Sequence, residues 1–201
     1  MTTNENSANE APARSHRDYY TALYQTALTI SSSLELDAVL QSVVIGITEA
    51  MQVKACTLRL LDPQSGNLRL RAVHGLSSSY LAKGPVDVEH SPLDSQALQG
   101  KTVIIPDVSV DKRFQYKDEA RREGIASVLC VPLEVHGRAV GVMRVYTTEV
   151  STFRDEDIQF LSVLASLSAL AIENASLYHN LKSSYDGVMD ALWGSSLPAE
   201  E

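Results

Sequence analysis

The stretch EGIASVLCVPLEVHGRAVGVMRVY, residues 123–146, decides the fold. It contains two apolar runs, Ser127–Val135 and Arg138–Tyr146, which are joined by His136-Gly137. Two such runs separated by a two-residue turn that contains glycine predict a β-hairpin. This hairpin is the second of two that the sequence predicts.

The first predicted hairpin lies between residues 54 and 74. Residues 54–61 alternate between polar and apolar side chains, and residues 68–74 do so again. The connection DPQSGN, residues 62–67, has the composition of a tight turn. Both hairpins together predict at least four antiparallel strands.

Alternation assigns the side chains of the first hairpin to two faces. Arg59 lies on the face opposite its apolar neighbours, toward the side on which we expect a ligand. Matching the apolar positions of the two strands places Arg69 and Arg71 on the face of Arg59, because a slip of one residue would bury the arginines. The apolar set on the other face consists of Cys56, Leu58, Leu60, Leu68 and Leu70.

Helical periodicity appears on both sides of the strands. Residues 15–33 are partly periodic, and Leu36–Met51 has one apolar face. Asp155 to about Trp193 predicts a single long helix with an acidic first turn. Helices segregated at the two ends of an antiparallel sheet predict an α+β fold.

Shorter elements are expected between the two hairpins. Pro85–Val88 and Thr102–Val108 predict short strands. Ser91 and Pro92 predict the start of a short helix that ends at Gly100. Lys117–Glu123 predicts a charged helix that ends at Gly124.

The bulk composition excludes several classes of protein. The 201 residues are 44% hydrophobic, which suffices for one buried domain. A formal net charge of −8 disfavours nucleic-acid binding. The sequence contains no run of 18 apolar residues, so no membrane span is predicted. The polar N-terminus lacks the apolar core of a signal peptide. We therefore expect a cytoplasmic protein. Neither the cysteines nor the histidines have metal-ligand spacing, so no metal is expected.

The chain resembles a GAF domain from about Leu34 to Ala175. The resemblance implies a GAF-like antiparallel sheet with the first, second and last helices on one face, and a pocket roofed by small helices and loops on the other. The domain organisation is then a disordered leader (1–14), an N-terminal helix (15–33), the GAF domain (34–175), a C-terminal helical extension (176–193) and a flexible tail (194–201). The stretches that carry the resemblance are LELDAVLQSVV, ACTLRLLDPQSGNLRLRAVHGL, TVIIPDVSVDKRF, EGIASVLCVPLEVHGRAVGVMRVY and FRDEDIQFLSVLASLSALAIENA.

The resemblance implies a location for a ligand. The family's strand order puts the last strand beside the first, so Arg59 and Arg144 become neighbours on the ligand face with Tyr146. Guanidinium groups there predict a site for a carboxylate or phosphate. In the alternative interpretation the face is partly solvated and these arginines pair with acids of the lid, namely Asp107, Asp118 or Glu119. Further candidate ligand contacts are Asp107, Phe114, Tyr116, Ala126 and Ser127.

One segment is similar to a motif of cyclic-nucleotide-binding GAF domains. Residues 111–114, DKRF, are followed after three residues by Asp118-Glu119, with Asp111 in place of the family's asparagine. That motif is associated with bracing the pocket lid. In the alternative interpretation, Phe114 anchors a loop in the core and the two acids belong to a short helix.

The resemblance also raises two kinds of chemistry that the residues do not favour. GAF-type free methionine sulfoxide reductases need several cysteines, because a second thiol must resolve the sulfenic acid. Only Cys56 and Cys130 are present, both in apolar runs that favour core packing. No cysteine lies within 107–127 to attach a bilin covalently. We therefore expect no catalytic residues.

The last helix predicts a dimer. Its apolar positions step by four and three over more than four heptads, from Phe160 to Leu192, and Asn174 is the polar exception. Beyond about Tyr178 this seam extends past any GAF core, so a second copy is the simplest partner. The alternative is that the helix packs on the N-terminal helix of its own chain. The predicted interface residues are Leu164, Leu167, Tyr178, Leu181, Tyr185 and Val188.

Three functions remain as hypotheses. The first is a sensor in which a small anionic ligand shifts a helical homodimer between states. The second is a structural dimerisation module that has no ligand. The third is a redox enzyme that uses Cys56 or Cys130. The chain is either a fragment of a larger signalling protein or a small regulator that acts on a separate partner.

Overall fold

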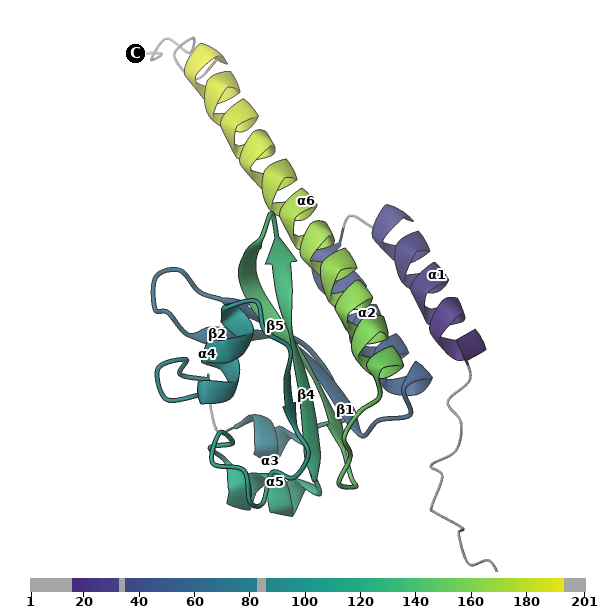
Figure 1. Cartoon of the computed structure of the whole chain (residues 1–201). Helices are drawn as coiled ribbons and strands as arrows, with labels where there is room; N and C mark the ends of the chain where they lie inside the picture. Colours follow the sequence, from purple (N-terminus) through teal and green to yellow (C-terminus); the bar gives the residue numbers. More distant parts are fainter. Residues whose placement is uncertain (1–15, 33–34, 83–85, 194–201) are drawn as a thin grey trace, which may run out of the picture.

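The computed structural model describes residues 16–32, 35–82 and 86–193. They form a five-stranded antiparallel sheet with the strand order β2-β1-β5-β4-β3, and helices cover both faces (Figure 1). The α+β fold predicted from the sequence is confirmed. The predicted leader (1–14) and tail (194–201) lie outside the described residues.

Eleven elements follow one another along the described chain. The strands are β1 (Ala55–Leu61), β2 (Leu68–His74), β3 (Val103–Ile105), β4 (Ser127–Val135) and β5 (Arg138–Thr147). The helices are α1 (His16–Ser32), α2 (Leu36–Ala50), α3 (Ser78–Leu81), α4 (Pro92–Leu98), α5 (Lys117–Glu123) and α6 (Asp155–Trp193).

Both predicted hairpins are confirmed, and the shorter elements differ in detail. The predicted strand Thr102–Val108 pairs only at Val103–Ile105, because Pro106 has no N–H with which to continue the ladder. Of the predicted strand Pro85–Val88, Pro85 lies outside the described residues and Val86 makes an isolated bridge to Leu68. Helix α3 was not predicted; Ser77 caps it by accepting the Tyr80 backbone N–H.

Helices α1, α2 and α6 lie side by side on one face of the sheet (Figure 1). The apolar face of α2 and the first half of α6 meet alternate side chains of β1, β4 and β5 in a single core. Cys56 and Leu58 on β1 belong to this face, as predicted, and so do Met143 and Val145 on β5. We call it the helix face.

A polar contact fixes α1 to the start of α6. The rings of Tyr19 and Phe160 stack with centroids 4.0 Å apart, and the Tyr19 hydroxyl donates to Asp157 Oδ1 at 2.5 Å. Asp157 is 1% exposed and also accepts the Arg154 backbone N–H at 2.9 Å. A buried carboxylate needs such donors, so this contact determines where α1 crosses α6.

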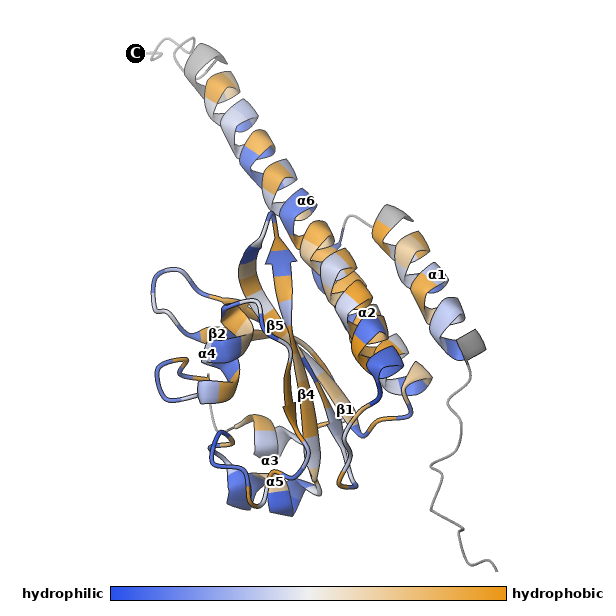
Figure 2. Ribbon diagram, in the orientation of Figure 1, coloured by the Kyte–Doolittle hydropathy of each residue, from blue (hydrophilic) through white to orange (hydrophobic). Residues whose placement is uncertain are grey.

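The opposite face of the sheet is covered by α3, α4, α5 and their connecting loops, which we call the lid. The lid and the sheet share a second buried cluster, whose sheet side includes Ala55, Val128, Cys130, Val142 and Tyr146. Figure 2 shows hydrophobic residues along the strands and hydrophilic ones on α5, the outermost part of the lid. Both faces of the sheet are therefore buried.

The predicted pairing of the first hairpin was wrong by one residue over part of its length. Leu58 lies opposite Ala72, but Arg59 lies opposite Leu70, so a bulge leaves Arg71 without a partner in the ladder. Since the bulge reverses the alternation, Leu68 joins the lid cluster and Leu70 shares the side of Arg59.

The bulge also removes two arginines from the expected ligand face. Arg69 pairs with Asp62 in the turn at 2.6 Å. Arg71 pairs with Asp37 of α2 at 2.6 Å, on the helix face. The expectation that Arg69 and Arg71 share the face of Arg59 was therefore wrong.

Helix α6 continues well beyond the sheet (Figure 1). By length and composition alone, Asp155–Met189 would suffice to cross a membrane. The first part of this segment is buried against the sheet and α2, where Leu161, Leu164 and Ala165 are fully buried. Apolar helices of this kind also form the interior of globular domains.

The contact between Tyr19 and Asp157 gives a prediction about stability. Tyr19→Phe removes one donor from a buried carboxylate while preserving the ring stack. We expect the free energy of unfolding to fall by about 1–3 kcal/mol in urea denaturation. The matched control is Tyr20→Phe, since Tyr20 is 71% exposed, and it should have no measurable effect. Equal stability of the two variants would contradict this role.

Candidate ligand site between the sheet and the lid

Arg59 and Arg144 project from the two central strands toward the lid. Thr57 lies directly opposite Arg144 in the β1–β5 pairing, which makes Arg59 and Arg144 diagonal neighbours. Their side chains share the face of the lid cluster, and the residues are only 4% and 5% exposed. The expectation of a partly solvated face was wrong, because the lid excludes water from both arginines.

Arg144 forms a buried ion pair with Asp94 of α4. Its Nη2 contacts Asp94 Oδ1, and Asp94 is 0% exposed. The other carboxylate oxygen accepts a hydrogen bond from the Ser91 hydroxyl at 2.6 Å. Ser91 occupies the N-cap position of α4 but gives its hydroxyl to this carboxylate, with no side-chain bond to the helix backbone.

Asp94 was not among the acids predicted to pair with the arginines. Those acids were Asp107, Asp118 and Glu119, but the structure pairs Arg144 with a different lid acid. One signal could have indicated Asp94: Ser91, Asp94 and Ala97 recur every three residues, which is the spacing of one helix side. All three residues are buried.

Arg59 is less well satisfied than Arg144. Its Nη1 donates to the Leu68 carbonyl at 3.5 Å, at the limit of a hydrogen bond. Within the described part of the chain, Arg59 Nε and Arg144 Nε have no hydrogen-bond acceptor. In the described structure, one carboxylate, that of Asp94, is therefore present for two buried guanidinium groups, and it contacts Arg144.

The electrostatics follow from this imbalance of charge. Burial lowers the pKa of Arg59, and the neighbouring Arg144 lowers it further. Burial also acts to lower the pKa of Arg144, but the adjacent Asp94 raises it well above its ordinary value. Arginine remains protonated in proteins, so the site has one positive charge in excess.

Aromatic hydroxyl groups complete the surroundings. Tyr146 is 2% exposed, and its hydroxyl lies 3.4 Å from Thr57 Oγ1. Tyr80 reaches the same cluster from α3, and burial raises the pKa of its phenol. The site therefore combines fixed positive charge with neutral hydroxyl groups, which suits binding of an anion.

The predicted lid contacts lie in two environments. Phe114 is buried in the lid cluster, and Tyr116 packs against that cluster while partly exposed. Asp107 accepts hydrogen bonds from the backbone and hydroxyl of Ser109, at 2.8 and 2.6 Å. Asp118 pairs with exposed Arg121. Asp107 thus stabilises a lid loop, and Asp118 pairs within helix α5.

Ala126 and Ser127 are engaged at the start of β4. The Ala126 N–H donates to the Thr147 carbonyl at 2.8 Å. Ser127 Oγ lies 2.8 and 2.7 Å from the carbonyls of Pro106 and Glu149, and it accepts the Ser151 N–H. The structure does not bring Ser127 to the two arginines.

The DKRF segment braces a lid loop. The Arg113 guanidinium grips both oxygens of Asp111 at 2.6 to 3.2 Å and donates to the Ile104 carbonyl at 2.9 Å. The Asp111 carboxylate also accepts the Arg113 backbone N–H. The side chains of Asp111 and Arg113 in this motif are therefore bonded to each other, and Arg113 is also bonded to the Ile104 carbonyl.

The two cysteines lie on opposite faces of the sheet. Cys56 belongs to the helix face and Cys130 to the lid cluster, where it lies opposite Arg144 in the β4–β5 pairing. Both thiols are free and buried. Burial raises the pKa of Cys130 to about 12 and raises that of Cys56 as well, so neither is a nucleophilic thiolate near neutral pH.

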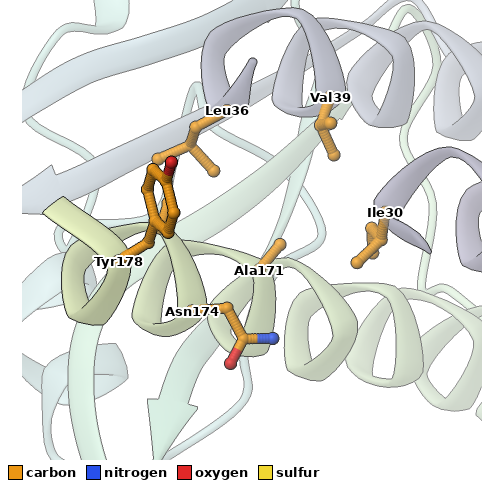
Figure 3. Close-up of a pocket in the computed structure, with 7 residues that line it drawn as sticks. Ile30, Leu36, Val39, Ala171, Asn174 and Tyr178 are labelled. Carbon is orange, nitrogen blue, oxygen red and sulfur yellow. The ribbon is translucent and has the colours of Figure 1, made fainter. Parts of the chain in front are cut away.

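A hollow lies on the helix face, where α6 leaves the core. It has a volume of about 180 Å³ and opens between α1, α2 and α6 (Figure 3). Asn174 points away from it, whereas the Tyr178 ring rises beside Leu36 (Figure 3). Its lining residues are Ile30, Leu36, Val39, Ala171, Asn174, Ala175 and Tyr178.

The predicted dimer residues divide at this hollow. Leu164 is fully buried and Leu167 packs against the core of its own chain. From the hollow onward the seam is exposed, and α1 exposes three large side chains of its own. The exposed positions are Tyr178, Leu181, Tyr185 and Val188 on α6, with Tyr20, Tyr24 and Leu28 on α1.

Comparison with known proteins agrees with this architecture. The GAF domain family model matches residues 35–172. The methyl sulfide methyltransferase-associated sensor of Methanosarcina acetivorans is 27% identical over 176 residues, which make up 82% of this chain and 18% of that protein. This chain thus spans less than a fifth of the sensor's length.

Solved structures show the same fold. The GAF domain of a phosphoenolpyruvate-protein phosphotransferase (ptsP) from Coxiella burnetii superposes with a TM-score of 0.73 at 21% identity, covering 82% of this chain and 98% of that one. Free methionine-R-sulfoxide reductase from Neisseria meningitidis gives 0.68 at 21% identity, covering 82% and 95%. At these identities the likeness shows the fold alone. Since the family model covers most of the chain, this protein belongs to the GAF domain family.

The buried ion pair gives a second prediction. Arg144→Met leaves the Asp94 carboxylate buried without its cation, so we expect the free energy of unfolding to fall by about 3–5 kcal/mol. Arg144→Met combined with Asp94→Leu should recover most of this loss, because the Asp94 carboxylate is then no longer buried without its cation. Arg69→Met, which breaks an exposed pair, should cost less than about 1 kcal/mol. Equal effects of Arg144→Met and Arg69→Met would contradict the buried pair.

The raised thiol pKa values give a third prediction. Iodoacetamide at pH 8 should leave Cys56 and Cys130 of the folded protein unmodified over the time in which it alkylates both in guanidinium chloride, as measured by mass spectrometry. Rapid alkylation of Cys130 in the folded protein would contradict it and would favour the redox hypothesis.

Proposed function

We propose that this chain is a non-catalytic sensory domain that binds a small anion between the sheet and the lid and signals through a helical homodimer. The observation that carries the proposal is the pair of buried arginines, Arg59 and Arg144, of which only Arg144 has a carboxylate partner among the described residues. Membership of the GAF family and the similarity to a protein named as a sensor support it.

The ligand class follows from the unsatisfied donors. A buried N–H without an acceptor costs free energy, and Arg59 and Arg144 each have one at Nε in the described structure. A carboxylate or phosphate presents two oxygens in the geometry of a guanidinium fork. An anion would also neutralise the excess positive charge, in a region where low dielectric strengthens the attraction.

The output of the domain is assigned to α1 and α6. The exposed seam of α6 continues past the sheet and has no partner within the described chain, so a second copy would bury it. The apolar hollow beside Tyr178 adjoins this seam and would be covered by the same contact. A ligand changes the helices only if it binds two arrangements of the dimer with different affinity.

The wider setting belongs to the same proposal. The domain acts in the cytoplasm and passes its state to a signalling partner, either in the same polypeptide or separate from it. The net charge of −8 favours protein and small-molecule partners over nucleic acid.

A second candidate function is a dimerisation module without a ligand. The observation that favours it is Asp94, because a carboxylate of the protein already occupies Arg144. In that case the ion pair and the apolar lid residues only stabilise the fold.

A thermal-shift screen separates the two functions. Acetate, succinate, inorganic phosphate, nucleoside monophosphates and cyclic nucleotides are tested on the unmodified protein. A ligand at a hundredfold excess over its Kd stabilises the native state by about 2.7 kcal/mol, which raises Tm. Arg59→Met should abolish the rise, whereas Arg69→Met on the surface of β2 should preserve it. A panel in which no anion raises Tm would favour the structural module.

The dimer is tested by one substitution in the seam. Leu181→Glu places a charge in the proposed interface and should convert a species of twice 21.9 kDa into a monomer, as measured by light scattering coupled to size exclusion. Ser183→Glu is the matched control, because it adds the same charge at an exposed position two residues away, off the seam. A monomeric unmodified protein at micromolar concentration would exclude the homodimer.

A further inference from the structure

We propose that Asp94 is a built-in competitor for the ligand: its carboxylate occupies the place on Arg144 that the ligand's carboxylate or phosphate takes, and the ligand binds by displacing it. This inference rests on the proposed function and deepens it. It makes Asp94 the residue that sets which anions bind and how tightly.

The ion pair resembles a ligand contact more than a structural bridge. Asp94 contacts Arg144 through Oδ1, while Oδ2 accepts from Ser91 on its own helix. Nη2 of Arg144 pairs with Asp94, and the Cys130 thiol also contacts the guanidinium, but Nε has no acceptor in the described structure. Asp94 therefore contacts only some of the N–H donors of the Arg144 guanidinium, and a free anion could contact more of them.

Arg59 explains why a ligand would replace the Asp94 carboxylate on Arg144. Asp94 has its ion pair with Arg144, whereas among the described residues Arg59 donates only the long hydrogen bond to Leu68. Since the two arginines are diagonal neighbours on β1 and β5, an anion held between them would contact both guanidinium groups. Asp94 is anchored on α4 and lacks the second contact.

The position of Asp94 limits the free-energy cost of moving its carboxylate away from Arg144. A carboxylate removed from its partner must reach water, since leaving it buried and unpaired would be costly. Helix α4 has seven residues, and its first residue Pro92 and the following residue Gln99 are exposed, so only one helix thickness separates Asp94 from solvent. The other buried residues of α4, Leu93 and Ala97, contribute only apolar contacts to the lid cluster.

Competition of this kind determines specificity. The internal carboxylate is present at a high effective concentration, so an anion with one weak contact does not displace it. An anion with two or more oxygens can contact both arginines and overcome the competition. The site therefore selects carboxylates and phosphates over monatomic anions such as chloride.

Chemical rescue tests whether the part of Arg144 that Asp94 contacts, which we call the seat, accepts a free anion. Asp94→Ala removes the carboxylate and should lower Tm, and sodium formate should restore Tm in a saturable manner because formate replaces the missing group. Formamide, and sodium chloride at equal ionic strength, should not restore it. The double variant Asp94→Ala/Arg144→Met should not respond to formate, and such a response would overturn the assignment of the seat.

A second variant keeps the shape of the side chain and removes its charge. Asp94→Asn should bind any anion found in the screen at least tenfold more tightly than the unmodified protein, as measured by calorimetry. Hydrogen exchange of the α4 amides should also increase in this variant, while that of β4 and β5 is unchanged. Equal or weaker anion binding by Asp94→Asn, or unchanged exchange in α4, would overturn the proposal.

The two proposals fail in different ways. If no anion in the screen stabilises either the unmodified protein or Asp94→Asn, the sensor function fails. If anions bind the unmodified protein through Arg59 but formate does not rescue Asp94→Ala, the competitor role fails and the sensor function stands. Rescue by formate together with tighter binding to Asp94→Asn supports both.

Discussion

Burial of both faces of the sheet is the constraint on which the rest of the structure depends. Alternation along β1, β4 and β5 sends one set of side chains to the helices and the other set to the lid. Arg59 and Arg144 fall in the second set, and a buried guanidinium requires an anion. The carboxylate of Asp94 on α4, the excess positive charge and the proposed ligand class all follow from that requirement.

The helix layer and the lid layer, on the two faces of the sheet, are built differently. The helix layer has an extensive apolar core and a buried contact between Tyr19 and Asp157 that sets the crossing of α1 and α6. The lid layer consists of short helices and loops, which are linked to the sheet by an apolar cluster and by the ion pair of Asp94 with Arg144. Both layers pack on β4 and β5.

Long, regular elements were predictable and local departures were not. The strand bounds of β2 and β4 and the helix bounds of α5 and α6 agree with the sequence, because periodicity and turn residues are local signals. The bulge opposite Leu58 and Arg59 was missed, since one inserted residue leaves the composition of both strands unchanged. That single residue moved Arg69 and Arg71 off the candidate site.

The sequence by itself determined the fold class, the longer elements and the side of the sheet on which Arg59 lies, because alternation and helical periodicity are properties of neighbouring residues. The resemblance to the GAF family supplied the side of the sheet on which Arg144 lies. Only the tertiary structure decided that both arginines are buried, that Asp94 and not another lid acid pairs with Arg144, and that Ser127 is occupied at the strand ends. Asp94 and Arg144 are fifty residues apart in the chain, and no local pattern links them. Which acid meets a given arginine is fixed by the packing of α4 on β5, and that packing is a property of the whole fold.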